Sequence, residues 1–363
     1  MSQEQEPPAV DWDIDHVSDD LESKFEDRLL RPGWDVHEDW EGEPKEQLQP
    51  FVWKWEDVID TIEQVEEELP YSELEQGLRR SLALTNPASD QDLPSPFLSV
   101  FFQTVTPEEE AGSHRHNVNA VRFVVDGNED TYTAVEGERF PMTDNALITT
   151  PNWTWHDHVN ESDERTIWID VLDWPLIGQH LNASVFDDHE QYQQPVDKSQ
   201  GYYNSQYGRL RPLRDQENKF RDVPPYRYSW DEAYTSITNA AEDGPDYVDD
   251  PYDGLVMEYV NPATGRGPTM STTSFRLQLL EEGQETKTHR HNSTEIYHVV
   301  QGSGETQVED TTLEWDTRDS FVVPQDQWHA HEAHDEETIL FVISDQPVFE
   351  AFNVHRVEGK DEE

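Results

Sequence analysis

The stretch HRHNSTEIYHVVQG, residues 289–302, decides the fold, because it repeats an earlier stretch, HRHNVNAVRFVVDG, residues 114–127. Further along the chain, PQDQWHAH at 324–331 matches PNWTWHDH at 151–158 in the same order. A unit of this size that occurs twice indicates an internally duplicated domain rather than a solenoid of short repeats. We therefore expect two domains of one architecture within the 363 residues.

The secondary structure predicted from the pattern is mainly β. Short runs of strand-forming residues, broken by turn residues such as Gly127 and Gly137, recur at regular spacing, which is typical of a sandwich or barrel. The expected strands lie at 97–105, 120–127, 130–137, 146–151, 166–173, 274–280, 296–302, 305–310, 320–324 and 338–344. Apolar residues at helical spacing predict helices over 55–69 and 72–84, and a shorter helix is expected near 230–241.

The composition is strongly acidic. The chain has 79 Asp and Glu against 25 Lys and Arg, a net charge of −54, and 11% aromatic residues, which argue against disorder. Such a surface repels nucleic acid and anionic membranes and becomes tolerable when salt screens it. The chain has no cysteine and no stretch resembling a signal peptide, and its apolar run 339–343 is too short to span a bilayer. We therefore expect a cytoplasmic protein of a halophile.

Histidines gather in four short windows, at 114/116, 156/158, 289/291 and 329/331. Because side chains in a strand alternate between its faces, each His-x-His pair points both rings to one side. A third histidine on a neighbouring strand would complete a metal site. Without sulfur ligands, imidazole and carboxylate groups suit Fe, Mn, Ni, Cu or Zn. Histidines that merely pack in strands are the alternative, and the duplication of the whole pattern argues against it.

The histidine windows resemble the metal motif of the cupin superfamily, H-x-H-x3-E-x6-G followed by P-x4-H. The second copy matches it in full through His289, His291, Glu295, Gly302, Pro324 and His329. The first copy has Ala120 at the glutamate position, which leaves His114, His116 and His156. Three ligands leave positions open on an octahedral ion, as a bidentate substrate and O2 would need.

A longer block resembles gentisate 1,2-dioxygenases and their relatives that cleave salicylate or 1-hydroxy-2-naphthoate. The block runs from HRHNVNAVRFVVDG through PNWTWHDHVNE to IWIDVLD, and FVWKWEDV, GLRRSLALTNP and PPYRYSWDEA also match. The resemblance implies a bicupin, that is, two double-stranded β-helix (jelly-roll) barrels behind an N-terminal helical arm. We expect an arm and helices over 1–90, a catalytic cupin over 91–180, a connecting segment over 181–262 and a second cupin over 263–355.

The family resemblance implies that His114, His116 and His156 hold Fe(II). It implies an aromatic hydroxy acid and O2 as substrates, with gentisate opened to a maleylpyruvate-type acid. Salicylate and 1-hydroxy-2-naphthoate remain alternative substrates. A bicupin that binds a ligand or metal without catalysis is an alternative of another class, and a metal-dependent sugar isomerase is a third. The resemblance also implies a homotetramer, in which the arm with Trp12, Trp34 and Trp40 could embrace a neighbour.

Several residues are candidates for handling an anionic substrate. Strand alternation points Arg122 into the same cavity as His114 and His116, where its guanidinium would suit a carboxylate. The family resemblance adds Arg79 and Arg80 as further cations and Gln103 as a cavity residue that could donate to the substrate or to oxygen. His158 could bond the substrate or act as an acid or base, and Asp170 could orient His158 or an arginine. The alternative for each arginine is an ordinary surface salt bridge.

The second cupin offers His289, His291, Glu295 and His329 as a second set of metal ligands. At the positions of Arg122 and Asp170 we expect His298 and Ser344, so the anion-binding pair is lost. We therefore expect a structural role for this barrel, with or without a metal.

Overall fold

The computed structural model describes residues 24, 27–29, 48–207, 223–242, 249–335 and 337–360. The chain divides into two units, Met1–Gln47 and Leu48–Glu363, and the fold below is that of the second unit. The predicted arm with Trp12, Trp34 and Trp40 lies outside the described residues. Among the described residues, no helix is both long and apolar enough to cross a lipid bilayer.

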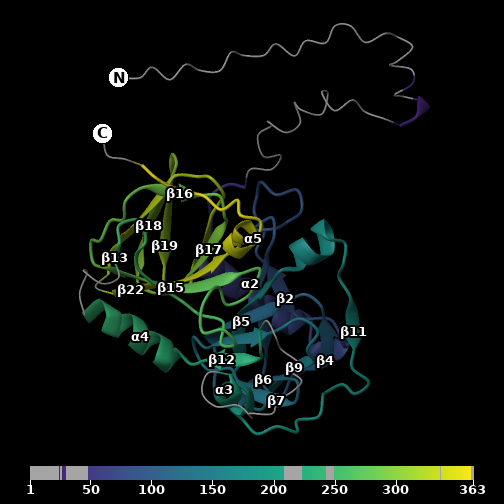
Figure 1. Ribbon diagram of the computed structural model, residues 1–363. Helices are drawn as coiled ribbons and strands as arrows, with labels where there is room; N and C mark the ends of the chain where they lie inside the picture. The colour runs from purple at the N-terminus through teal and green to yellow at the C-terminus, as the bar shows by residue number, and fades with distance from the viewer. Residues whose placement is uncertain are drawn as a thin grey trace, which may run out of the picture. The chain divides into compact units, whose positions relative to one another are not determined.

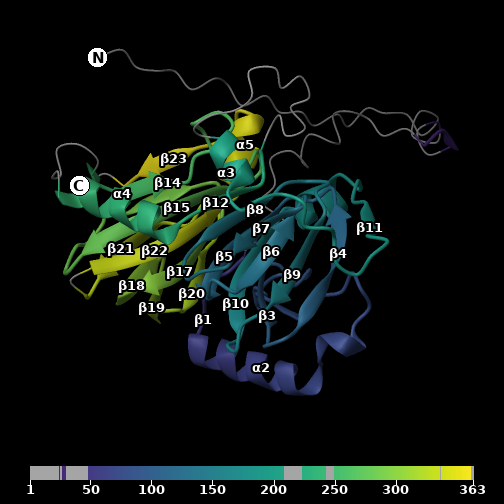
Figure 2. The same ribbon diagram turned by 90° about the horizontal axis from the view of Figure 1, so that it is seen from below.

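The first barrel is built from two antiparallel sheets and is coloured blue to teal in Figures 1 and 2. The six-stranded sheet has the order β12 (Tyr226–Tyr228), β8 (Leu147–Thr150), β5 (Ala120–Asp126), β10 (Thr166–Leu172), β3 (Ser99–Val105), β2 (Ser81–Ala83). The five-stranded sheet has the order β11 (Phe186–Asp188), β4 (Glu110–His116), β9 (His156–Asn160), β6 (Thr131–Val135), β7 (Glu138–Pro141).

The second barrel, green to yellow in the same figures apart from its purple strand at residues 51–53, repeats this plan. Its seven-stranded sheet has the order β1 (Phe51–Trp53), β20 (Ser320–Val323), β17 (Glu295–Gln301), β22 (Glu337–Ser344), β15 (Ser274–Glu281), β14 (Gly254–Glu258), β13 (Asp249–Asp250). Its five-stranded sheet has the order β19 (Thr311–Asp316), β18 (Ser303–Val308), β21 (His329–Ala333), β16 (His289–His291), β23 (Val357–Gly359). The prediction of two mainly-β barrels is therefore confirmed.

Strand alternation separates a packing face from a functional face on β5. Val121 and Phe123 belong to the apolar cluster shared by the two barrels, whereas Val124 belongs to the cluster inside the first barrel. Both faces of β5 are therefore covered, which explains why its sequence reads as an almost continuous apolar run. Arg122 interrupts that run and is 2% exposed. A buried arginine needs polar partners, so its position marks a polar site within the barrel.

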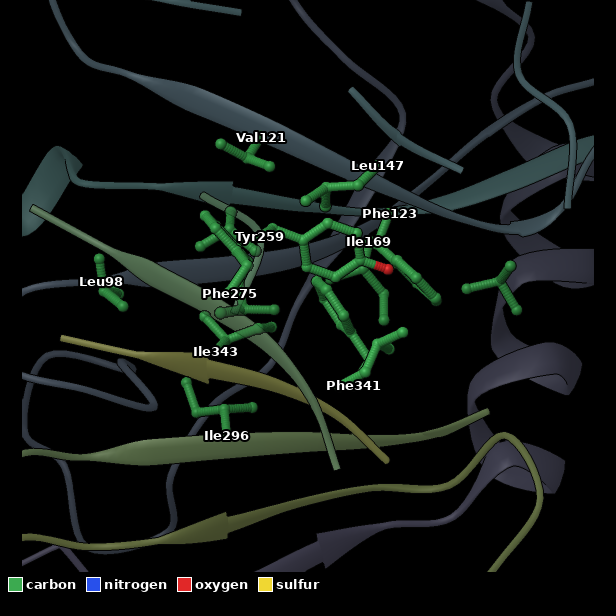
Figure 3. Close-up of a cluster of buried hydrophobic side chains, with 14 of the residues drawn as sticks. Leu98, Val121, Phe123, Leu147, Ile169, Tyr259, Phe275, Ile296, Phe341 and Ile343 are labelled. Carbon is green, nitrogen blue, oxygen red and sulfur yellow. The ribbon is translucent and has the colours of Figure 1, made fainter. Parts of the chain in front are cut away.

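The shared apolar cluster fixes the two barrels against each other. Figure 3 shows Phe123 and Ile169 of the first barrel facing Phe341 and Ile343 of the second. The rings of Phe123 and Phe341 are stacked, with centroids 4.0 Å apart. Both rings are fully buried, and burying a side chain of this kind contributes about 2 kcal/mol. The six- and seven-stranded sheets thus share one core, and the opposite face of each sheet lines the interior of its own barrel.

Two helices pack against the apolar cluster shared by the two barrels, to which they contribute Ile62 and Ile237. The predicted helices at 55–69 and 230–241 are confirmed as α2 (Trp55–Glu68) and α4 (Trp230–Glu242). The remaining helices are short: η2 (Tyr71–Glu73), η3 (Pro175–His180), α3 (Tyr202–Gln206) and α5 (Gln346–Ala351).

The predicted helix over 72–84 is wrong. Only the single 3-10 turn of η2 forms, and the segment ends in strand β2, which pairs with β3. Tertiary contacts override the local helix pattern here, because the Gln76 side-chain amide donates to the carbonyl oxygens of Ser113 and His189 at 2.9 and 2.8 Å. These bonds hold the chain in an extended course beside β4.

The connecting segment supplies strands to both barrels. β11 and β12 extend the two sheets of the first barrel, and β13 and β14 extend the seven-stranded sheet of the second. The segment is therefore more than a linker. The domain boundaries predicted after residues 90, 180 and 262 stay predictions.

Candidate metal centre and substrate cavity

Three histidines meet at the end of the five-stranded sheet in the first barrel. His114 and His116 lie on β4, and His156 is the first residue of β9, directly opposite His114 in the antiparallel register. One ring nitrogen of each lies within 4.8 Å of the others, a spacing that a single metal ion could bridge. The ring centroids of His114 and His156 are 4.3 Å apart. The duplicated motif thus brings its three predicted ligands to one point.

Backbone carbonyls fix the orientation of two of these rings. His116 Nδ1 lies 2.7 Å from the Val118 carbonyl oxygen, and His156 Nδ1 lies 2.9 Å from that of Thr154. A proton on Nδ1 satisfies each carbonyl and leaves Nε2 as a free lone pair, which is the form that binds a metal. Nε2 of His156 is buried and has no hydrogen-bond partner within the part of the chain that the structure describes. Such an atom inside a protein calls for a ligand.

Burial keeps the three imidazoles neutral. Desolvation lowers the pKa of His116 to about 4, and it lowers the pKa of both His114 and His156 well below the ordinary value. The charges of Arg79 and Arg122 act in the same direction on His114. Neutral imidazoles can bind a metal at neutral pH without first losing a proton.

A cavity of about 420 Å³ opens beside the three histidines. Three buried polar residues from neighbouring strands of the six-stranded sheet line it: Gln103 on β3, Arg122 on β5 and Asp170 on β10. Gln103 Nε2 donates to Asp170 Oδ2 at 3.0 Å, and Arg122 Nη2 lies 3.7 Å from the same oxygen. The opposite Arg122 nitrogen, Nη1, donates to the Thr150 hydroxyl. The predicted residues Gln103, Arg122 and Asp170 therefore share one wall with the histidines.

The charges on this wall influence one another. Burial raises the pKa of Asp170, and the guanidinium of Arg122 opposes that rise. Burial also lowers the pKa of Arg122, while Asp170 acts to raise it. Gln103 Oε1, Asp170 Oδ1 and Arg122 Nε are all buried without a partner among the described residues. The wall therefore presents two unused acceptors and one unused donor.

The two adjacent arginines of the first barrel occupy different surroundings. Arg79 lines the cavity, with Nη2 2.5 Å from His114 Nδ1 and 2.8 Å from the Gly112 carbonyl oxygen. Arg80 turns away and donates to both carboxylate oxygens of Glu109, at 2.9 and 2.5 Å. The structure therefore corrects the expectation for Arg80, because its buried guanidinium is held in an ion pair with the partly buried Glu109 and does not line the cavity.

His158 also lies away from the cavity. It points to the same side of β9 as His156 but is two residues deeper, fully buried, and packed on Trp168 with ring centroids 4.7 Å apart. Desolvation lowers its pKa well below the ordinary value. His158 is not among the residues that line the cavity, so a contact between this ring and a substrate stays a prediction.

Two contributors to the site were not foreseen from the sequence. Phe186 on β11 stacks on His114 with centroids 5.0 Å apart, and Thr150 accepts from Arg122. The cavity is otherwise largely apolar, since Leu78, Phe101, Val118, Leu172, Trp174 and Val185 also line it. The connecting segment that carries Phe186 shows no periodic pattern, so nothing in the sequence placed it against a histidine.

The second barrel holds a matching group formed by His289, His291 and His329, again with ligand atoms within 4.8 Å of one another. The expectation that His298 and Ser344 replace Arg122 and Asp170 is wrong. Since Glu295 pairs with Ser344 as Ala120 pairs with Leu172, the equivalents are Tyr297 and Val342. Nevertheless the site retains a partly buried cation, because Arg276 on β15 donates to Glu295.

Fold and site together define a two-barrel cupin protein with a candidate metal centre in each barrel. The sequence profile of the Cupin domain family matches residues 101–172 and 276–344, which cover the central strands of both barrels.

The chain is 45% identical to a gentisate 1,2-dioxygenase from Haloferax sp, over 97% of this chain and 98% of that protein. It is 34% identical to a 5-aminosalicylate 1,2-dioxygenase from Comamonas sp, over 97% and 92%. The crystal structure of salicylate 1,2-dioxygenase from Pseudoaminobacter salicylatoxidans as an adduct with gentisate superposes with a TM-score of 0.82 at 28% identity, covering 96% of this chain and 97% of that one. The chain belongs to the gentisate 1,2-dioxygenase family of ring-cleaving enzymes.

Proposed function

We propose that this chain is an Fe(II)-dependent gentisate 1,2-dioxygenase. In that reaction the ring bond between the carboxyl-bearing and the hydroxyl-bearing carbons breaks, and both atoms of O2 enter the product, maleylpyruvate. The observation that carries the proposal is the meeting of three neutral histidines with Arg122, Asp170 and Gln103 around one cavity. The names of the relatives support gentisate as the substrate.

The donor set fits iron. His114, His116 and His156 offer three nitrogen atoms, and Ala120 leaves no carboxylate ligand from β5. Imidazole is a ligand that iron accepts readily, and a face of three ligands leaves room for a substrate and O2. A ferrous ion held there would supply the redox chemistry that activates O2 towards the aromatic ring.

The protein's own groups would bind and orient the substrate. A carboxylate entering a chain of net charge −54 needs local cations, and Arg122 and Arg79 provide them at the cavity wall. Asp170 acts as a positioning residue because it lies beside the Arg122 guanidinium and accepts from Gln103. The apolar lining would pack against the ring and exclude water, which strengthens these polar contacts.

Metal binding by His114 would change the contact between this ring and Arg79. A guanidinium can only donate, so its contact with His114 Nδ1 places a lone pair on that nitrogen. A metal bound at Nε2 needs the Nδ1 proton back, and the Gly112 carbonyl oxygen lies 3.4 Å away to accept it. Arg79 would then turn to another acceptor, and a substrate carboxylate would supply one. We infer that metal loading and substrate binding both favour this reorientation.

The test is oxygen consumption by purified protein in high salt after anaerobic loading with Fe(II). With gentisate and 18O2, we expect oxygen uptake, rising near-ultraviolet absorbance and a product that carries two labelled oxygen atoms. Salicylate and 1-hydroxy-2-naphthoate serve as alternative substrates in parallel reactions. Absence of uptake with all of them would favour the alternative of a bicupin that binds a ligand without catalysis.

We further propose a homotetramer in the cytoplasm of a halophile, with no nucleic acid or membrane partner. The net charge of −54 and the Haloferax relative support the salt-rich setting, since counterions screen such a surface. Exposed apolar side chains beside the cavity mouth, among them Trp174, Val185 and Phe186, support contact with another subunit. Sedimentation in molar salt measures the subunit number, and a monomer would contradict this part of the proposal.

A further inference from the structure

The histidine cluster of the second barrel has the internal order of a metal site. His289 and His291 lie on β16 and His329 begins β21, with the ring centroids of His289 and His329 4.2 Å apart. His291 Nδ1 lies 2.9 Å from the Ser293 carbonyl oxygen, and His329 Nδ1 lies 3.0 Å from that of Gln327. The Nε2 atoms of His291 and His329 are therefore lone pairs, and both are buried without a hydrogen-bond partner in the described structure.

Two carboxylates border this cluster, although neither belongs to the group whose ligand atoms all lie within 4.8 Å of one another. Glu295 Oε2 lies 3.5 Å from His291 Nε2, and Asp253 Oδ1 lies 3.4 Å from His289 Nε2. Adjacent ligands of one octahedral ion are separated by roughly 3 Å when the bonds are about 2.1 Å long. Each carboxylate is thus near the spacing of a neighbouring ligand to one histidine, and binding of a metal would draw it towards the other two. Glu295 belongs to the cupin motif, whereas Asp253 comes from the turn between β13 and β14 in the connecting segment.

The surroundings hold Glu295 in place. Arg276 donates to Glu295 Oε1, and the Tyr297 hydroxyl donates to Oε2 at 2.5 Å. Arg276 and Tyr297 thus orient the carboxylate as outer partners commonly orient metal ligands. The first barrel has Ala120 in place of Glu295 and Arg122 in place of Tyr297, so its three histidines face a cavity rather than an anchored carboxylate.

We propose that the second barrel binds one divalent transition metal ion through His289, His291, His329, Glu295 and Asp253, as a closed structural site that admits no substrate. Three neutral imidazoles and two carboxylates balance the charge of a dication. Three imidazoles alone leave both positive charges uncompensated, so that site can still bind an anionic substrate. Five protein ligands leave at most one position of an octahedral ion open, which is too few for a bidentate substrate together with O2. This proposal does not depend on the proposed reaction of the first barrel.

Metal content is the first test. Protein stripped with a chelator and reloaded with Fe(II) in the absence of air should bind two ions per chain by elemental analysis. His329→Ala and His156→Ala should each bind one. Oxygen uptake by His329→Ala provides the folding control, because the first site lies in the other barrel and should keep its activity. One ion per chain in the wild type, or no loss of metal in His329→Ala, would overturn the second site.

Nitric oxide binds ferrous ions that have an open position and gives a characteristic electron paramagnetic resonance signal, so its response to added gentisate tests whether a bidentate acid can also reach the ion. We expect gentisate to change the signal of His329→Ala, which keeps the first site, and to leave any signal of His156→Ala unchanged. A change caused by gentisate in His156→Ala would show that the second site admits a substrate and would overturn the closed coordination. Asp253→Asn, which preserves shape, should weaken retention of the second ion at least tenfold against a chelator. Retention equal to the wild type would remove Asp253 from the ligand set.

Discussion

Gln103 donates its side-chain amide to Asp170 over 3.0 Å, and this bond fixes the orientation of the amide. A carboxylate oxygen accepts only from the NH2 group, so Gln103 Oε1 must point elsewhere. It is buried at the cavity wall without a partner among the described residues. An acceptor in this position is suited to a substrate that carries a further donor on its ring, as gentisate does.

Replacing Gln103 should therefore lower kcat/KM for gentisate more than kcat/KM for salicylate. Gln103→Leu removes the acceptor, so kcat/KM for gentisate should fall about tenfold, the value of one buried hydrogen bond of about 1.4 kcal/mol. Salicylate lacks the additional hydroxyl, so its kcat/KM should change much less. The measurement is the ratio of the two constants. An equal fall for both acids would show that Gln103 acts through Asp170 rather than on the substrate.

Arg79 and Arg80 form a matched pair of adjacent residues with separate roles. Arg80→Met breaks the ion pair with Glu109 and should lower the free energy of unfolding by about 3 kcal/mol, with little change in KM at a temperature where the variant is folded. Arg79→Met should raise KM for gentisate at least tenfold and change stability less. Thermal unfolding and steady-state kinetics of both variants test this. The opposite assignment of effects would show that the cavity cation is Arg80.

His298 predicts a specific pH dependence of stability. Desolvation lowers the pKa of this buried histidine to about 3, whereas an unfolded histidine titrates near 6.5. The unfolded chain therefore takes up a proton first, so stability falls as pH drops from about 6.5 towards 3. His298→Gln cannot titrate and can still bond Ser320, the partner of His298 at 3.1 Å. Within this window, the unfolding free energy of the wild type should fall, relative to that of the variant, by about 1.4 kcal/mol for each unit by which the pH is lowered. A difference independent of pH would contradict this explanation.

The sequence predicted most of the barrel strands, because each is a short apolar run closed by a turn. It also predicted the clustering of three histidines in each barrel, because the motif is duplicated and strand alternation gives both rings of a pair one direction. These are local properties that a single segment carries by itself.

Features that depend on distant contacts were missed. The segment 72–84 has helical spacing, yet Gln76 and Arg80 bond to β4 and to Glu109 instead. Alternation correctly placed His158 on the face of His156 but could not tell how deep in the barrel that position lies. Phe186 and Asp253 come from the connecting segment, and only the folded structure brings them to His114 and His289.

The most direct test of the account compares oxygen uptake with gentisate by two histidine variants, His156→Ala and His329→Ala, each loaded with Fe(II). They remove equivalent residues from the two barrels, so general effects of losing a buried histidine are matched. We predict that His156→Ala loses at least a thousandfold in rate while His329→Ala stays within about threefold of the wild type. Retained activity in His156→Ala, or its loss only in His329→Ala, would contradict the assignment of ring cleavage to the first barrel.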